Sequence, residues 1–412
     1  MRRYLRAGHV ITGPDVYDDG AVLIEDDTIE AVGPAEGIDA NDADIERNLP
    51  DHTLMPGLID GHVHLTGPDA ETGSTEDLFA TSPPEMTLRT LRNAQRTLKA
   101  GVTTVRDCGG ANDLPMAVRN RIAAGDFTGP RIIAAGQGLS ATHGHGDLLP
   151  WHVDTHLETD SGNIGSKGIV ANGPSGVRQA VRERLKLGAD FIKVWATDGI
   201  GDASGGTVLS YTQEELAAIC DEAGRHGVPV AAHAYGAEAI NACIDAGVHS
   251  IEHGLLMDEA AIDRMVANDV HLTFTYATIS RIASDDGYLS SPNARGALDH
   301  QLEMVPIADD RGVQFAMGTD AGTLTENGEN AVELVHMVED AGFSPLEAVR
   351  IATAGSAAMV GLEDAIGTLE TGYTADMIAI AGDPLADITT VADPNMVELV
   401  LRDGTPVKDT LD

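Results

Sequence analysis

Three things are scarce in this sequence of 412 residues: cysteine, lysine and long apolar runs. The three cysteines (Cys108, Cys220 and Cys243) are too few for a disulfide framework, so nothing calls for an oxidising compartment. No run of about 18 apolar residues is present, which excludes a membrane-spanning helix. The first residues, MRRYLRAGHVITG, turn polar too early for a secretory signal. We therefore expect a cytoplasmic protein.

Positive charge is also scarce. Asp and Glu number 65 against 26 Lys and Arg, which gives a formal net charge of −39, and only five of the basic residues are lysines. A surface this negative repels phosphate groups, which argues against nucleic acids and anionic membranes as partners. An excess of acid with little lysine is typical of proteins that work in molar salt, where screening removes the repulsion between like charges. We therefore predict a salt-adapted, halophile-like source.

The length suits one large α/β barrel with an appended domain. Hydrophobic residues make up 42% and charged residues 22%, which suits a globular protein with a sizeable core. Residues 1–55 show short β segments between glycines, such as AVLIEDDTIEAV, and residues 367–412 show the same pattern. The two ends therefore predict one small β-sandwich domain that both termini build.

Residues 56–366 alternate short apolar runs with helical patterns, as βα units around a parallel sheet do. Thr212 with Glu215, and Ser344 with Glu347, mark helix starts. Candidate strands lie at 54–65, 102–108, 131–136, 191–196, 229–235, 250–253, 271–277 and 314–319. Eight strands with helices between them predict an α/β fold with a closed (β/α)8 TIM-like barrel.

Residues that can bind metal stand at the ends of these strands, where such barrels carry their active sites. The first strand ends in PGLIDGHVH, and His62 and His64 are two residues apart, so both rings face the same side. Two imidazoles at a barrel mouth can share one divalent metal ion. His233 in AAHAYG, His253 in IEHG and Asp320 in GTDAG each end another predicted strand.

Lys193 lies inside the apolar strand FIKVWA. A buried ammonium is costly, so this lysine would lose its proton readily, and a neutral amine can act as a nucleophile. The alternative is a lysine whose amine reaches solvent at the strand end. Any one of these residues alone would more often be a satisfied core residue, but four histidines, one lysine and one aspartate in barrel register favour a metal site.

In order and spacing, PGLIDGHVH, FIKVW, AAHAYG, IEHG and GTDAG resemble the metal-dependent amidohydrolase superfamily over essentially the whole chain. The segment GTLETGYTADMIAIAGDPLADI resembles the C-terminal β segment of that superfamily. A lysine on the fourth strand, followed by HAYG on the fifth, resembles the pattern of the binuclear, prolidase-like branch of that superfamily. That branch cleaves dipeptides and related N-acyl amino acids.

The resemblance implies a ligand role for each of these residues. His62, His64 and Asp320 would hold the more buried of two divalent metal ions. His233 and His253 would hold the more exposed one.

Lys193, carboxylated by CO₂, would bridge the two ions as a carbamate. The ions are expected to be Zn²⁺, although Mn²⁺ and Co²⁺ also suit nitrogen and oxygen ligands. A bridging hydroxide would attack the scissile carbonyl, and Asp320 would pass the proton of the water to the leaving amine. The implied function is hydrolysis of the amide bond of an Xaa-Pro type dipeptide or an N-acyl amino acid.

Three further residues are candidates for substrate binding. The loop ATHGHG carries His143 and His145, one of which is expected to hydrogen-bond the substrate or its oxyanion. Tyr235, two residues after the strand-five histidine, is expected to bind a substrate carboxylate. Arg106 and Asp107, after the second strand, form either a structural ion pair or a substrate contact, and we favour the ion pair.

Two other functions stay open. An imidazolonepropionase-like cyclic amide hydrolase binds one metal and carries an Arg soon after its His-x-His, whereas HVHLTGPDAET has no Arg and Lys193 is present. A metal-free, non-enzymatic scaffold of the same fold would have lost ligands that this chain retains. A deaminase is disfavoured because HAYGAEAI lacks a His-x-x-Glu pattern. We expect a small-molecule substrate and a homo-oligomer.

Overall fold

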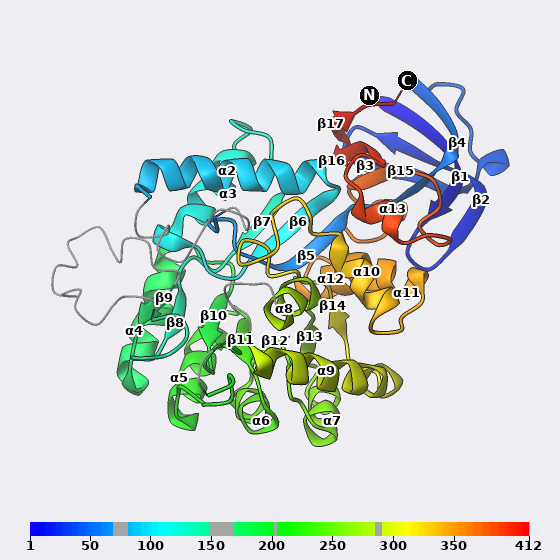
Figure 1. The fold of residues 1–412 in the computed structure, drawn as a ribbon. Coiled ribbons are helices and arrows are strands. Elements are labelled where there is room, and N and C mark those ends of the chain that lie inside the picture. Colours follow the sequence, from blue (N-terminus) through cyan, green and yellow to red (C-terminus); the bar gives the residue numbers. More distant parts are fainter. Residues whose placement is uncertain (69–80, 148–167, 202–203, 285–290, 412) are drawn as a thin grey trace.

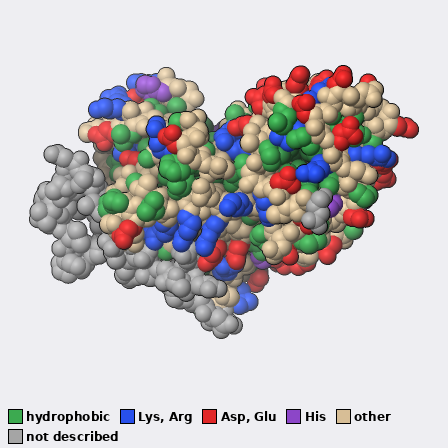
Figure 2. Space-filling model, turned by 90° about the horizontal axis from the view of Figure 1, so that it is seen from above, with side chains coloured by type: hydrophobic (Ala, Val, Ile, Leu, Met, Phe, Trp, Pro, Cys, Tyr) green, Lys and Arg blue, Asp and Glu red, His purple; other side chains and the backbone are tan. Residues whose placement is uncertain are grey.

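The computed structural model describes residues 1–68, 81–147, 168–201, 204–284 and 291–411. A β domain that contains both ends of the chain lies beside a barrel with helices on its outside (Figure 1). Acidic side chains gather along the edge of the right-hand lobe in Figure 2, and several Lys and Arg side chains lie nearer the middle of this face. In the part of the chain that the structure describes, no helix is long and apolar enough to cross a membrane.

The β domain is one seven-stranded sheet in the order β17-β16-β15-β4-β1-β2-β3. Only the β1–β4 pair is parallel. Apolar side chains from both halves of the sheet, among them Ile24 and Leu399, share one buried cluster, which gives a sandwich-like packing. The prediction that both termini build this domain is confirmed. Its strands are β1 (Arg2–Ile11), β2 (Val16–Glu25), β3 (Thr28–Pro34), β4 (Ile45–Pro56), β15 (Met377–Ala381), β16 (Val397–Arg402) and β17 (Thr405–Asp409).

The barrel has a parallel strand at each of the eight predicted positions. All of these strands except the third are fully buried, as expected for strands covered on both faces, and in the third strand buried and half-buried residues alternate. They are β5 (Leu58–Val63), β6 (Val102–Asp107), β7 (Arg131–Ala134), β10 (Ile192–Trp195), β11 (Val230–Ala234), β12 (Ser250–His253), β13 (His271–Thr273) and β14 (Phe315–Ala316).

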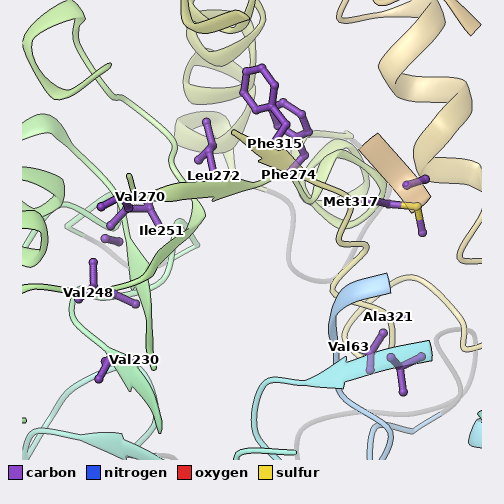
Figure 3. Packing of buried hydrophobic residues seen from close by; sticks show 14 of the residues in the cluster. Val63, Val230, Val248, Ile251, Val270, Leu272, Phe274, Phe315, Met317 and Ala321 are labelled. Carbon is purple, nitrogen blue, oxygen red and sulfur yellow. The ribbon is translucent and has the colours of Figure 1, made fainter. Parts of the chain in front are cut away.

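The barrel closes between its first and last strands. A bridge joins Val63 to Ala321, and Figure 3 shows these two side chains next to each other. At the third position, β7 is followed by β8 (Gly138–Ser140), which pairs with β10 and with the additional strand β9 (Gly168–Val170). The (β/α)8 fold class is therefore confirmed, with the third strand in two pieces.

Helices follow the strands, and both predicted helix starts are present, each with a capping box, at Thr212 with Glu215 and at Ser344 with Glu347. The helices are α2 (Pro83–Lys99), α3 (Leu114–Ala123), α4 (Gly173–Leu187), α5 (Gln213–Gly224), α6 (Ala237–Ala246), α7 (Glu259–Ala267), α8 (Tyr276–Ala283), α9 (Pro292–Asp310), α10 (Val332–Glu339), α11 (Pro345–Arg350), α12 (Ser356–Met359) and α13 (Thr389–Ala392). The division into a β domain of 1–55 with 367–412 and a barrel of 56–366 stays a prediction.

Candidate metal centre

His62 and His64 lie at the end of β5, and both side chains are buried. The Nδ1 atom of His62 is 2.7 Å from a carboxylate oxygen of Glu252. The Nδ1 atom of His64 is 2.8 Å from the carbonyl oxygen of Gly109. In a neutral imidazole these contacts place the proton on Nδ1 and leave the lone pair on Nε2, the arrangement typical of a metal ligand.

Asp320 follows β14 and faces these two rings. Its Oδ1 atom is 3.2 Å from Nε2 of His64 and 3.9 Å from Nε2 of His62. The backbone N–H of Asp320 donates to the carbonyl of His62, and that of His64 donates to the carbonyl of Ala321. Asp320 has a left-handed φ of 55°. A Cβ at Gly322 would lie 1.9 Å from the His64 carbonyl oxygen, so only glycine allows this close approach.

The donor set of His62, His64 and Asp320 fits a divalent metal ion. Their ligand atoms all lie within 4.8 Å of one another. With neutral rings, two imidazole lone pairs face a carboxylate oxygen, which is unfavourable unless a cation lies between them. Burial raises the pKa of Asp320, but His64, His62 and His253 together hold that pKa well below its usual range.

A second group of possible ligands, His62, Cys108 and Glu252, fits a metal less well. Burial raises the pKa of the Cys108 thiol to about 12, whereas a metal ligand must be a thiolate. Glu252 is already paired with Arg106 at 2.6 Å.

Lys193 on β10 is buried beside the first group, with 1% of its surface exposed. Its Nζ atom lies 3.5 Å from Nε2 of His62 and 5.8 Å from the centre of the Trp195 ring. Among the residues that the structure describes, His62 is its hydrogen-bond partner, and no carboxylate forms an ion pair with it. The amine therefore does not reach solvent.

His233 and His253 end β11 and β12, with ring centres 4.7 Å apart. Nε2 of His233 is 3.1 Å from the carbonyl oxygen of Asp198, and Nδ1 of His253 is 2.7 Å from the hydroxyl of Thr275. Each ring thus has its other nitrogen available as a ligand. Burial, and then neighbouring imidazoles, lower the pKa of both rings well below the usual value, so both are neutral, as metal ligands must be.

Of the predicted substrate residues, His145 and Tyr235 lie against this cluster. The rings of His145 and His233 are stacked, with centres 4.9 Å apart. The buried ring of Tyr235 is 4.5 Å from that of His233. His143 is exposed, and its backbone N–H donates to Asp147. Within the described residues, no ring contact joins His143 to the cluster.

The sequence analysis favoured an ion pair between Arg106 and Asp107, and this choice of partner was wrong. Arg106 pairs with Glu252, while the carboxylate of Asp107 accepts backbone N–H groups of Leu65 and Gly109. Glu252 was missed altogether, although it directly precedes His253 in the IEHG motif. A charged residue inside a predicted strand of the barrel was the signal that could have found it.

Comparison with known proteins shows which proteins the chain as a whole is similar to. Residues 53–407 match the sequence model of the amidohydrolase family. Ochratoxinase of Aspergillus niger is 31% identical, over 97% of this chain and 85% of that protein, and its crystal structure superposes with a TM-score of 0.89. A Xaa-Pro dipeptidase with bound methionine is 32% identical with a TM-score of 0.86, over 99% of this chain and 100% of that one. A prolidase complexed with N-methylphosphonate-L-proline is 30% identical with a TM-score of 0.88, over the same shares of both chains.

Proposed function

The chain belongs to the amidohydrolase family and is a hydrolase of that type, and from this premise we propose that it is a binuclear, metal-dependent enzyme. Its proposed reaction is hydrolysis of the amide bond in an Xaa-Pro type dipeptide or an N-acyl amino acid. Similarity to a Xaa-Pro dipeptidase and a prolidase supports this class of substrate. The observation that carries the proposal is the buried Lys193 amine, 3.5 Å from His62 and without a carboxylate partner in the described structure.

His62, His64 and Asp320 would hold one metal ion, and Nδ1 of His233 with Nε2 of His253 would hold the other. When bound, the two ions would lower the pKa of a water molecule and polarise the scissile carbonyl.

Lys193, as a carbamate, would be a ligand of both ions. Its neutral amine would attack CO₂, forming a nitrogen–carbon bond and releasing one proton. The product is an anion, which suits a buried position between two cations better than an ammonium does.

The remaining groups would move one proton and hold the substrate. Asp320 would accept a proton from the attacking water, whose oxygen bonds to the amide carbon, and would deliver it to the amine nitrogen as the carbon–nitrogen bond breaks. His145 would donate a hydrogen bond to the carbonyl oxygen, and the Tyr235 hydroxyl would donate one to the substrate carboxylate.

Several finer points remain proposals of the same kind. Zinc is the metal we favour, with Mn²⁺ or Co²⁺ as alternatives, because the ligand set is nitrogen and oxygen. Adaptation to high salt is supported by the net charge of −39. A cytoplasmic location, a homo-oligomer, and a lack of nucleic acid or membrane partners stay predictions from composition.

The test combines metal analysis with a substrate panel in molar KCl. Purified protein should hold about two divalent ions per chain. It should release free amino acids from some members of a panel of Xaa-Pro dipeptides, Xaa-Arg dipeptides and N-acyl amino acids, and Asp320→Asn should abolish that release. Active protein with one ion or none would contradict the binuclear site. Metal-loaded protein that cleaves no amide in the panel would contradict the substrate class.

A further inference from the structure

Glu252 is a carboxylate buried in the barrel, with none of its surface exposed. One oxygen lies 2.7 Å from Nδ1 of His62, and the other accepts from Arg106 and from Ser250, both at 2.6 Å. We infer that Glu252, held by Arg106, is a positioning residue that sets the orientation and basicity of His62 as a metal ligand. This inference rests on the metal site proposed above.

The backbone explains how one strand supplies both a ligand and a positioning group. Successive residues of a strand normally face opposite sides, so Glu252 and His253 would be separated. His253, however, has a left-handed φ of 70° and is followed by Gly254, which has a φ of 62°. The chain turns at this point, so that Glu252 contacts Nδ1 of His62 while the His253 ring lies 4.9 Å from the same ring.

Arg106 is fixed as firmly as the carboxylate that it holds. Its Nε donates to the carbonyl oxygen of Gly61 at 2.6 Å and one terminal nitrogen donates to Ser250 at 3.0 Å. Its guanidinium carbon lies 5.2 Å from the centre of the Phe191 ring. A buried arginine bound on three sides holds Glu252 in place, and its positive charge favours the ionised carboxylate.

A charged acceptor on Nδ1 affects His62 in two ways. It holds the proton on Nδ1, so that the Nε2 lone pair faces Asp320 and Lys193. It also increases the electron density on Nε2, which strengthens a metal bond at that atom. A neutral amide at position 252 would keep the shape of the site but remove the charge.

The experiment measures metal affinity in Glu252→Gln, with Glu333→Gln as the control for losing a buried carboxyl group elsewhere in the barrel domain. Glu333 is also a fully buried glutamate in the barrel, but it binds the backbone of α8 and contacts none of the candidate ligands. Competition with a chelator should show a loss of affinity of about 10–100-fold in Glu252→Gln and little change in the control. The visible spectrum of the Co²⁺ form should change in Glu252→Gln only.

The double variant Arg106→Met with Glu252→Gln separates positioning from folding. Removing both charges avoids an unpaired buried arginine, so the thermal stability of the metal-free protein should recover relative to Glu252→Gln. Its metal affinity should stay low, because His62 still lacks a charged partner. Wild-type affinity and an unchanged Co²⁺ spectrum in either folded variant would overturn the inference alone. A wild-type protein that binds no metal would overturn the proposed function with it.

Discussion

The ring of His145 is stacked on the ring of His233, with centres 4.9 Å and planes 17° apart. This contact places the glycine-rich loop after β8 beside the candidate metal ligands. It also separates two histidines that the sequence left equivalent. Both are exposed, but within the described residues only His145 has a ring contact with a candidate ligand, while the backbone of His143 bonds to Asp147.

Replacing His145 should mainly lower kcat. A hydrogen bond to the carbonyl oxygen becomes stronger as that oxygen gains charge in the transition state, so its loss slows the chemical step. We expect His145→Ala to lower kcat by about 100-fold, in the range seen for oxyanion donors, with KM little changed. His143→Ala is the control and should resemble the wild type. Equal effects of the two variants would refute the assignment to His145.

Replacing Tyr235 should mainly raise KM. The hydroxyl is expected to bind a carboxylate that is charged in both the ground state and the transition state, so its loss weakens both equally. Tyr235→Phe keeps the ring against His233 and removes only the hydroxyl. A hydrogen bond to a charged group corresponds to a rise in KM of about tenfold to a hundredfold. The check is steady-state kinetics, including a substrate whose carboxylate is amidated, for which the variant and the wild type should not differ.

Lys193 should be essential for activity but costly for stability. Lys193→Ala removes the carbamate, so metal binding and activity should be lost, and short carboxylic acids should partly restore activity by occupying the same space. In metal-free protein, Lys193→Met replaces a buried amine that has no carboxylate partner in the described structure by an apolar chain of similar volume, so its melting temperature should equal or exceed that of the wild type. A large loss of stability in metal-free Lys193→Met would show that the amine has a structural role instead.

The sequence could predict the barrel because short strand-like segments alternate with helical patterns, and several of these segments end at a distinctive residue. His62 and His64 are an example, since the strand period of two places both rings on one side. The number of barrel strands could be predicted in the same way. The third strand, however, consists of two pieces, because β7 pairs with β6 and β8 pairs with β10.

The contacts between motifs could not be predicted in the same way. Strand periodicity predicts that Glu252 and His253 point to opposite faces of the sheet. The left-handed backbone of His253 changes this, so that both side chains approach His62. The choice between His143 and His145 depends on the conformation of a loop, for which no periodic pattern exists. The partner of Arg106 lies 146 residues away, so its neighbour Asp107 was the natural but wrong choice.

Glu333 should make stability depend on pH. Its buried carboxylate accepts the backbone N–H groups of Tyr276 and Ala277, both at 2.8 Å, yet burial raises its pKa from 4.5 to about 8. Because the folded protein has the higher pKa, the protonated acid stabilises it fully below about pH 4.5, and this contribution is lost as the pH rises through about 8.

The wild type should therefore lose stability relative to Glu333→Gln between these pH values, with a slope of up to about 1.4 kcal/mol per pH unit. Urea unfolding of both proteins across this range, without metal, measures the difference. Parallel curves for the two proteins would show that Glu333 does not titrate in this range.

Salt should stabilise the protein well into the molar range. Two effects oppose each other, because salt weakens surface ion pairs but also screens the repulsion within a chain of net charge −39. The pairs are mostly exposed, such as Arg6 with Asp19 and Arg311 with Asp263, and pairs of this kind contribute only about 0–1 kcal/mol each. The repulsion involves the whole surface, so screening should dominate and the melting temperature should rise with KCl.

A charge variant tests that cause directly. Glu36, Asp42 and Glu46 are exposed, and none of them forms an ion pair within the described residues. Changing all three to Gln or Asn removes repulsion without removing a pair, so the variant should melt higher than the wild type in dilute buffer and approach it in molar KCl. A nonionic osmolyte at equal osmolality is the control for effects other than screening, and it should leave the difference between the two proteins unchanged. A wild-type melting temperature that is flat or falls from dilute to molar KCl would rule out salt adaptation.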